Sequence, residues 1–474
     1  MTILATSSGS SGRSGPSGRS ESSGLSGLSE RVRDRLTALG LGVAALAFRL
    51  WHLSSPKGFV FDEVYYAQNA NSLLHHGVEL DLKSAAAQFI VHPPIGKWMI
   101  AAGIKIFGYH EFGWRFMGAL VGASSIVMVF YIARRLFADY FPALAAGILI
   151  AADGLNLVMS RTALLDIFLM FFTLLAFLFL LRNQHLAAGI CLGLAAATKW
   201  SVIYYLVVYL GFTLYSDYRR NRALELESPV SELLRKNVLK RSVQYLLVPF
   251  CIYALSWSGW FFNTSGYDRQ WAKGQGHGLF GFIPGPIRSL WHYHSEMWSF
   301  HTTLTTSHPY SANPWSWLIM ARPTSFYYET PKNCGLPACA QEVLALGTPY
   351  LWWSGVAAIA ITFGYWIARR EWQSGVLLLS LAAGYLPWFA WQRRTVFNFY
   401  SIAFEPFLVL TIAYCLSKFL EPDSEGQVSN WRYILSIGFL AAIVLNFLYF
   451  LPLDLGNVIT YGHWSTLMWF PSWI

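Results

Sequence analysis

The sequence predicts an all-α integral membrane protein, and three features predict this class. Of the 474 residues, 55% are hydrophobic and only 12% are charged, whereas a soluble domain has roughly 25% charged residues. Several apolar stretches approach the roughly 20 residues that cross a hydrocarbon core of about 30 Å. Basic clusters separate many of these stretches. Because every backbone amide inside a bilayer must be hydrogen-bonded within the protein, we expect the spans to be helices.

The first 30 residues form a separate segment. They are mainly Ser, Gly and Arg, so ordering them would not bury enough apolar surface to offset the lost entropy. We predict a disordered cytoplasmic tail over residues 1–30 and one membrane domain over residues 31–474. The first apolar stretch, LTALGLGVAALAFRLWHL, has no small-residue cleavage site, so it is predicted to remain as a spanning helix.

About eleven membrane spans are predicted from the apolar stretches. Their approximate limits are 36–53, 114–133, 141–158, 164–181, 186–198, 201–216, 242–260, 349–368, 373–391, 396–417 and 433–452. If the N-terminus is cytoplasmic, the inner loops hold most basic residues, as expected for membrane proteins. These residues are Arg31, Arg33, Arg35, Arg134, Arg135, Arg182, Arg219, Arg220, Arg222, Lys236, Lys240, Arg241, Arg369 and Arg370. The short outer loops then hold only Arg161, Lys199, Arg393 and Arg394.

Two long segments, about 55–113 and 261–348, lie outside in this arrangement. Both are rich in Trp, Tyr, His and Pro, which favours ordered, functional loops. The formal charge of +9 is explained by cytoplasmic loops next to anionic membrane lipids. No compact basic module interleaved with aromatic residues occurs, so nucleic acid is not expected as a partner.

The five cysteines do not define a disulfide framework. Cys191, Cys251 and Cys415 lie in apolar stretches, where an inert thiol is expected. Cys334 and Cys339 share a predicted outer loop, where disulfides persist. Both a disulfide and two free thiols are compatible with this position.

The first outer loop opens with an acidic pair, Asp62 and Glu63, close to the membrane. Carboxylates at this depth are costly unless they are paired or used. One interpretation is a catalytic pair. The alternative is that both acids only interact with the dipole at the start of a helix.

Basic residues supply the other candidates for a site. His92 and Lys97 lie in HPPIGKW near a predicted helix start, although Lys97 could instead extend to the lipid headgroups. Arg49 lies inside the first span and needs an anionic partner. Arg161 is followed by Asp166, so it fits either a substrate contact or a structural pair with that carboxylate.

Carboxylates that accept protons and arginines that match phosphate oxygens favour transfer from a lipid phosphate to a hydroxyl. We expect no metal or other cofactor, because no His and Asp cluster has metal-ligand spacing. The segments HHG at 75–77 and WHYHSEMWSFH at 291–301 are expected to face the membrane interface or a sugar.

At these residues the chain resembles the protein O-mannosyltransferases, membrane enzymes of the GT-C type, and especially their actinobacterial branch. The resemblance covers nearly the whole chain after the tail. It is carried by the ordered motifs RLWHLSSPKGFVFDEVYY (49–66), HPPIGKW (92–98), SRTALLDIFLMFF (160–172), ATKWSVIYY (197–205), HPYSANPWSWLIMARPTSFYYE (308–329) and RRTVFNFYSIAFEP (393–406).

The resemblance implies a GT-C fold in the plasma membrane, with an extracytoplasmic active site. It implies a polyprenyl-phosphate mannose donor, Ser or Thr acceptors in proteins crossing the membrane, and inversion at the anomeric carbon. Asp62 would be the base, and Glu63 would help to hold the acceptor. Arg161 and Arg394 would bind phosphate with support from Arg49. A Sec translocon partner is compatible with this family. The second outer segment is too short for the β-trefoil module of the eukaryotic members.

Two other classes of function remain open from the sequence. A GT-C relative could use another lipid-phosphate sugar, or a lipid or glycan acceptor, with the same charges. A transporter would use intramembrane Arg and Asp residues along its path, but it predicts paired repeats with broken helices, and no such repeat is found. A purely structural scaffold would leave the polar and aromatic outer loops without a purpose.

Overall fold

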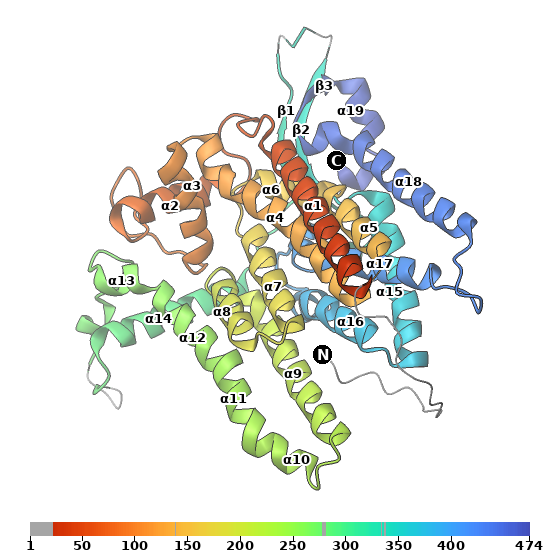
Figure 1. The fold of residues 1–474 in the computed structure, drawn as a ribbon. Coiled ribbons are helices and arrows are strands. Elements are labelled where there is room, and N and C mark those ends of the chain that lie inside the picture. Colours follow the sequence, from red (N-terminus) through yellow and green to blue (C-terminus); the bar gives the residue numbers. More distant parts are fainter. Residues whose placement is uncertain (1–21, 138, 277–280, 333, 336–337) are drawn as a thin grey trace.

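The computed structural model describes residues 22–137, 139–276, 281–332, 334–335 and 338–474, and Figure 1 shows their arrangement. Helix α1 (Ser22–Leu50) begins before the predicted end of the tail. Residues 22–30 of the predicted tail are therefore helical, and the division into a tail and a membrane domain stays a prediction. Residues 1–21 of the predicted tail lie outside the described part of the chain.

The described chain is mainly helical, with one small sheet. The first half contains α2 (Glu63–His76), α3 (Ile95–Phe107), α4 (Glu111–Phe137), α5 (Tyr140–Ala151), α6 (Gly154–Arg161), α7 (Asp166–Leu181), α8 (His185–Ala196), α9 (Ile203–Ala223), α10 (Pro229–Glu232), α11 (Leu239–Ser242) and α12 (Val248–Ser256). The second half contains α13 (Ser258–Phe262), α14 (Gly285–Thr303), α15 (Pro349–Arg369), α16 (Trp372–Tyr385), α17 (Glu405–Phe419), α18 (Asn430–Asp454) and α19 (Tyr461–Leu467). Strands β1 (Thr324–Glu329), β2 (Cys339–Ala345) and β3 (Val458–Thr460) form an antiparallel sheet in that order.

All eleven predicted apolar stretches fall on helical segments, which confirms the helical membrane class. Among the described residues, five helical segments are long and apolar enough to cross a membrane: Glu111–Phe137, Pro229–Ser256, Pro349–Arg369, Trp372–Trp391 and Asn430–Asp454. Helices α5 and α6 make a sixth if this pair, bent by 56°, is one span. The number eleven stays a prediction.

Several predicted spans are interrupted, and local chemistry explains three of the interruptions. The stretch 141–158 breaks because the Asp153 carboxylate accepts a hydrogen bond from the Asn156 N–H and starts helix α6. The stretch 373–391 changes to a 3-10 helix at Leu386, next to a proline. The stretch 396–417 contains a 3-10 helix at Asn398–Ala403 before α17 begins with Pro406 in its first turn.

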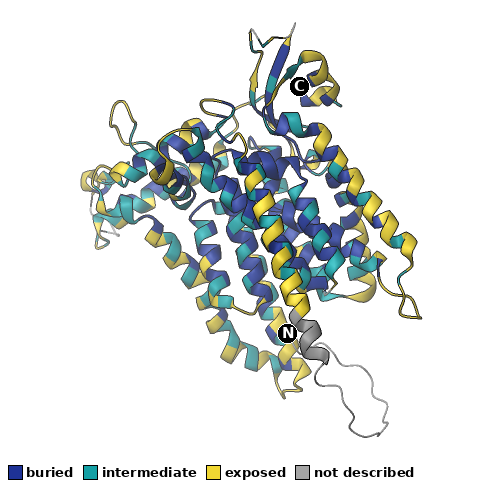
Figure 2. Ribbon diagram, turned by 45° about the horizontal axis from the view of Figure 1, so that its top comes forward, coloured by how far each residue is buried: buried dark blue, intermediate teal, exposed yellow. Residues whose placement is uncertain are grey.

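Helix α4 lies inside the helical bundle and α18 lies at its edge. In the most apolar window of each helix, 67% of the residues of Glu111–Phe137 are buried, against 33% for Asn430–Asp454. Figure 2 shows the exposed residues along the outer helices. Helix α3 packs closely on α4 because Gly103 has no side chain, since a Cβ there would lie 2.4 Å from the Gly113 carbonyl oxygen.

The two segments predicted as outer loops are folded. The first contains α2 and α3, and the second contains the end of α13 followed by α14, β1 and β2. In Figure 1 the sheet and α19 lie at the top, and the hairpin of α9 and α10 lies at the bottom. The bottom hairpin carries Arg219, Arg220 and Arg222. The basic hairpin and the sheet therefore occupy opposite ends of the molecule.

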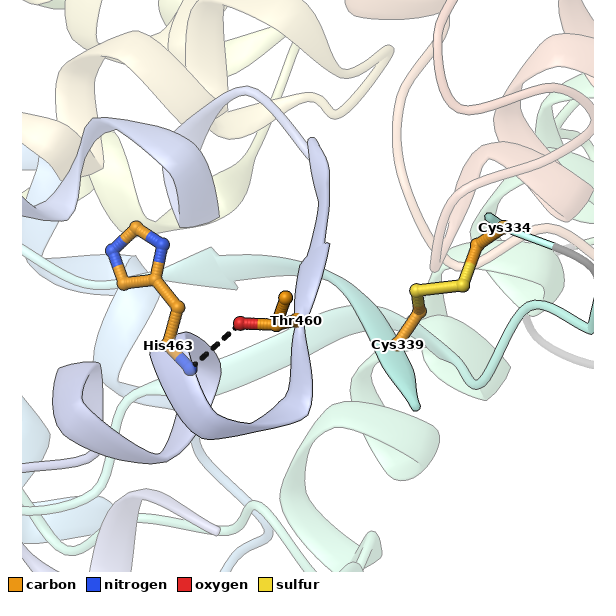
Figure 3. Close-up of a disulfide and its surroundings, with 4 residues drawn as sticks. All are labelled: Cys334, Cys339, Thr460 and His463. Carbon is orange, nitrogen blue, oxygen red and sulfur yellow. Dashed lines mark hydrogen bonds between the residues drawn. A yellow bond between two sulfur atoms is a disulfide. The ribbon is translucent and has the colours of Figure 1, made fainter. Parts of the chain in front are cut away.

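A disulfide joins Cys334 and Cys339, whose Cα atoms are 6.6 Å apart (Figure 3). This resolves the two alternatives left by the sequence. Cys339 begins β2 and pairs with Thr460 of β3. The Thr460 hydroxyl accepts a hydrogen bond from the His463 N–H, 3.1 Å away, and caps α19. The second long segment is thus joined to the C-terminal helix.

Candidate active site

Asp62 stands at the start of α2, and its position is fixed by the residue before it. Phe61 has a φ of 50°, a conformation that costs an aromatic residue about 1–3 kcal/mol. Its ring stacks on Phe326 of β1 at a centroid distance of 4.7 Å, so aromatic packing compensates for the strain. The Asp62 side chain makes no capping hydrogen bond to α2. Its carboxylate is therefore not used to start the helix.

The surroundings of Asp62 make its carboxyl group suited to proton transfer. Burial raises the pKa of Asp62 from 3.8 to about 6. The positive charge of Lys199 lowers the pKa of Asp62, and the negative charge of Asp166 raises it. At neutral pH the group is mostly ionised, yet it is a stronger base than an ordinary aspartate.

Glu63 has a different role from its neighbour. Its buried carboxylate forms an ion pair with Arg115 of α4, with Nη2 and Oε2 2.8 Å apart. It also accepts hydrogen bonds from the N–H groups of Val60 and Ala163, both at 2.9 Å. These contacts join the start of α2 to α4 and to the turn after α6. These contacts give Glu63 a positioning role, and the acceptor contact that the resemblance implied stays a prediction.

Arg394 reaches the same region from the segment before α17. Its Nη2 is 3.3 Å from Nδ1 of His301 on α14. The other ring nitrogen of His301 lies 2.6 Å from the Val91 carbonyl oxygen, so Nε2 donates and Nδ1 is left to accept. Burial lowers the pKa of His301 to about 4, so this ring is neutral. Arg394 Nε is buried and has no partner among the described residues.

His92 lies beside His301, and its role as a site residue stays a prediction. Its ring is 5.1 Å from that of His301. Burial lowers the pKa of His92 well below its usual value, and Lys199, His301, Lys97 and Arg394 act in the same direction. The neutral imidazole therefore lies in a region of positive potential.

Lys199, which the sequence analysis did not select, is central to the site. Its Nζ is 2.9 Å from both carboxylate oxygens of Asp166 and 4.6 Å from the centre of the Tyr400 ring. The proposed pair between Arg161 and Asp166 is therefore wrong. Asp166 forms its ion pair with Lys199, which is 33 positions away along the chain. The sequence signals for Lys199 were its place in the motif ATKWSVIYY and its place among the few basic residues of the short outer loops.

Arg161 and Arg49 lie together at the end of α1. Arg161 donates to the main-chain carbonyls of Arg49, Trp51 and His52 at 2.6–3.0 Å. Arg49 donates to Oδ1 of Asn156 at 2.7 Å. In the described part of the chain, neither guanidinium forms an ion pair with a carboxylate. Arg161 thus stabilises the carboxyl end of α1, where a cation is favoured.

Lys97 is a structural residue. It is buried and forms an ion pair with Glu79, and its Nζ also lies 3.1 Å from the His92 carbonyl oxygen. Extension of Lys97 to the headgroups is therefore excluded. Its contact places His92, so Lys97 acts on the site through the backbone.

The described residues thus gather a basic carboxylate, Asp62, a lysine held by a second carboxylate, Asp166, and a guanidinium without an acidic partner, Arg394. Burial and the Asp62 charge raise the pKa of Tyr66 well above its usual value, so its hydroxyl stays protonated. In this set of residues, Asp62 can remove a proton from a hydroxyl, and the cations Lys199 and Arg394 can stabilise an anion.

Two protein families match the chain. Residues 40–258 match the family described as dolichyl-phosphate-mannose-protein mannosyltransferase. Residues 286–473 match the C-terminal four-transmembrane region of protein-O-mannosyltransferase. Together these matches contain Asp62, Lys199, His301 and Arg394.

Relatives from three bacteria match most of the chain. The polyprenol-phosphate-mannose–protein mannosyltransferase of Mycobacterium tuberculosis is 35% identical over an alignment of 454 positions, which covers 87% of this chain and 86% of that protein. The protein of the same name from Mycolicibacterium smegmatis is 33% identical and covers 92% of each chain. The one from Corynebacterium glutamicum is 30% identical and covers 93% of this chain and 94% of its own.

Solved structures share the fold. The Saccharomyces cerevisiae Pmt1–Pmt2 complex bound to the sugar donor matches with a TM-score of 0.74 at 16% identity, over 93% of both chains. ArnT from Cupriavidus metallidurans bound to undecaprenyl phosphate matches with a TM-score of 0.54 at 15% identity, over 88% of this chain and 76% of its own. These likenesses support a GT-C membrane fold.

Proposed function

This chain belongs to the protein O-mannosyltransferase family, and we propose that it transfers mannose from a polyprenyl phosphate to Ser or Thr hydroxyl groups of proteins. The donor and acceptor classes follow those named for the relatives that are at least 30% identical. The observation that carries the proposal is the Asp62 carboxylate, which makes no capping hydrogen bond and lies close enough to Lys199 for that charge to lower its pKa. Arg394, whose buried Nε has no partner among the described residues, acts on the same tyrosine, Tyr66, as Asp62 does.

Asp62 serves as the general base. A Ser or Thr hydroxyl is a weak nucleophile at neutral pH, and a positioned carboxylate contributes about 10²–10⁴-fold by taking its proton in the transition state. The acceptor oxygen bonds to the anomeric carbon of mannose while its proton passes to Asp62. The raised pKa of Asp62 brings the base closer to neutral pH.

The leaving group is the polyprenyl phosphate. As the bond between the anomeric carbon and the phosphate oxygen breaks, both electrons stay with the phosphate, which gains negative charge. Arg394 can donate hydrogen bonds to this oxygen, and Lys199 adds positive potential. If base and phosphate lie on opposite faces of the sugar, the reaction inverts the anomeric carbon.

The site also suggests where the reaction takes place. The α9–α10 hairpin carries Arg219, Arg220 and Arg222. It lies at the opposite end of the molecule from the sheet and the disulfide (Figure 1). Basic loops favour the cytoplasm and disulfides favour the exterior. We therefore assign the catalytic face to the extracytoplasmic side of the plasma membrane, where segments leaving a Sec translocon would be accessible.

The activity is tested by incubating membranes that contain the chain with labelled polyprenyl-phosphate mannose and a Ser/Thr-rich peptide. We expect label on the peptide, and none on a matched peptide with Ala at every Ser and Thr. Transfer to lipid or glycan in place of the Ser/Thr peptide would overturn the proposed acceptor. Transfer from a different lipid-phosphate sugar only would overturn the proposed donor.

The role of Arg394 is tested against its neighbour in the sequence. We expect Arg394→Gln to lower kcat/KM for polyprenyl-phosphate mannose about 10²-fold, because the variant loses a hydrogen-bond donor directed at the developing phosphate charge. Arg393 is exposed, so the control Arg393→Gln should change kcat/KM by about twofold or less. Equal losses in both variants, at unchanged unfolding temperature, would contradict a specific phosphate contact of Arg394.

A further inference from the structure

A second group of polar side chains lies on α14, away from the proposed catalytic groups. Asp268, His292 and Glu296 each present one potential ligand atom, and these atoms all lie within 4.8 Å of one another. His292 and Glu296 are one helical turn apart on α14, and Asp268 comes from the connection after α13. The sequence has no metal-ligand spacing here, because the third residue is brought in by the tertiary fold.

The distances within this group fit shared ligation better than direct pairing. His292 Nε2 is 3.4 Å from Oδ2 of Asp268 and 3.6 Å from Oε1 of Glu296. A charge-assisted N–H···O bond would be about 2.7–2.9 Å long. In contrast, two ligand atoms at about 2.0–2.1 Å from one tetrahedral metal ion are about 3.3–3.4 Å apart. The two distances from His292 are close to this spacing, and the three ligand atoms all lie within 4.8 Å of one another.

The ligand atoms are held in place by their surroundings. The His292 ring stacks on Trp271 with a centroid distance of 4.1 Å and an interplanar angle of 6°. Asp268 has a φ of 48°, a left-handed conformation that is uncommon for a residue other than glycine and that Asp tolerates better than most. The stacked ring and the local turn keep Nε2 directed at both carboxylates.

The charge of the group also favours a cation. With a neutral imidazole, the two carboxylates give the group a formal charge of −2. A divalent ion would neutralise this negative potential.

We propose that Asp268, His292 and Glu296 bind a divalent transition-metal ion of the Zn²⁺ class. One imidazole nitrogen and two carboxylate oxygens suit this class. The ion would fasten the segment around Asp268 to α14. Helix α14 also carries His301, which contacts Arg394. The proposed metal site is thus structural and is separate from proton transfer at Asp62.

The test uses the full chain in detergent, without a polyhistidine tag, after removal of metal with a chelator. Zn²⁺ alone is titrated, and bound metal and unfolding temperature are measured. We expect one Zn²⁺ per chain and a higher unfolding temperature with Zn²⁺. Loss of an outer contact to a metal ligand weakens binding about 10–100-fold. We therefore expect at least a tenfold loss of affinity for His292→Ala and for the nearly isosteric Asp268→Asn.

The matched control is His463→Ala, an exposed histidine of α19. It should bind Zn²⁺ like the wild type. If the wild type binds no more Zn²⁺ than Asp268→Asn, or if Zn²⁺ raises the unfolding temperature of both equally, the group is an ion pair of protonated His292 and the proposal is wrong. Because these measurements do not involve mannose transfer, their outcome is independent of the proposed activity.

Discussion

Asp62→Asn is expected to reduce mannose transfer about 10²- to 10⁴-fold, because the amide cannot accept the proton of the acceptor hydroxyl. The Asp62 side chain does not cap α2, so the variant should keep the fold. The measurement is the initial rate of transfer from polyprenyl-phosphate mannose to a Ser/Thr peptide at equal amounts of membrane-inserted protein. Asp62→Asn with wild-type activity would exclude this carboxylate as the base.

A matched control distinguishes the base from a general effect of charge. Glu329 is an exposed carboxylate at the end of β1. Glu329→Gln removes the same charge with the same change in shape, and we expect it to keep wild-type transfer. A similar loss in both variants would indicate a long-range electrostatic effect and would contradict a specific role of Asp62.

The pH dependence of the wild type provides a second measurement of the same group. The ionised carboxylate is the active form, and burial raises the pKa of Asp62 to about 6. The transfer rate should therefore fall as pH decreases through about 6, approaching a tenfold loss per pH unit below it. An ordinary aspartate would keep its activity to about pH 4. A profile that is flat between pH 7 and pH 4.5 would contradict the raised pKa.

Glu63→Gln is expected to lower the free energy of unfolding by about 3–5 kcal/mol, because it leaves Arg115 as an unpaired buried charge. Both side chains are almost fully buried, and Nη2 and Oε2 are 2.8 Å apart. The measurement is denaturant or thermal unfolding in detergent. The lost ion pair also anchors the turn that presents Asp62, so transfer should fall as well.

Two further variants separate the buried pair from other effects of the substitution. Glu232→Gln removes a carboxylate from an exposed pair with Arg235, and it should change stability little. The double variant Glu63→Gln with Arg115→Met removes both buried charges, and it should recover part of the stability lost by Glu63→Gln. A Glu63→Gln protein as stable as the wild type would contradict the structural role of this pair.

Much of the fold follows from properties of short segments. Apolar stretches of helical length predicted the helices, and aromatic content predicted that the two long segments are ordered. The ordered motifs indicated the family and contained Asp62, His92 and Arg394. These features can be read locally, because burial in lipid and helix formation depend on residues close together in the chain.

Partners across the chain are decided by the tertiary structure. Asp166 pairs with Lys199, 33 positions away, and Glu63 pairs with Arg115, 52 positions away. Sequence spacing left open a pair of Arg161 with Asp166 or a substrate contact of Arg161, and it gave no partner for Lys97. Asp268 joins two residues of α14 only because the connection after α13 folds back. The sequence alone therefore determined a helical membrane protein with its family motifs. The tertiary structure decided which charged residues form structural ion pairs and which are available for catalysis. An ion pair forms between groups that are close in space, and the hydropathy of the sequence does not encode that distance.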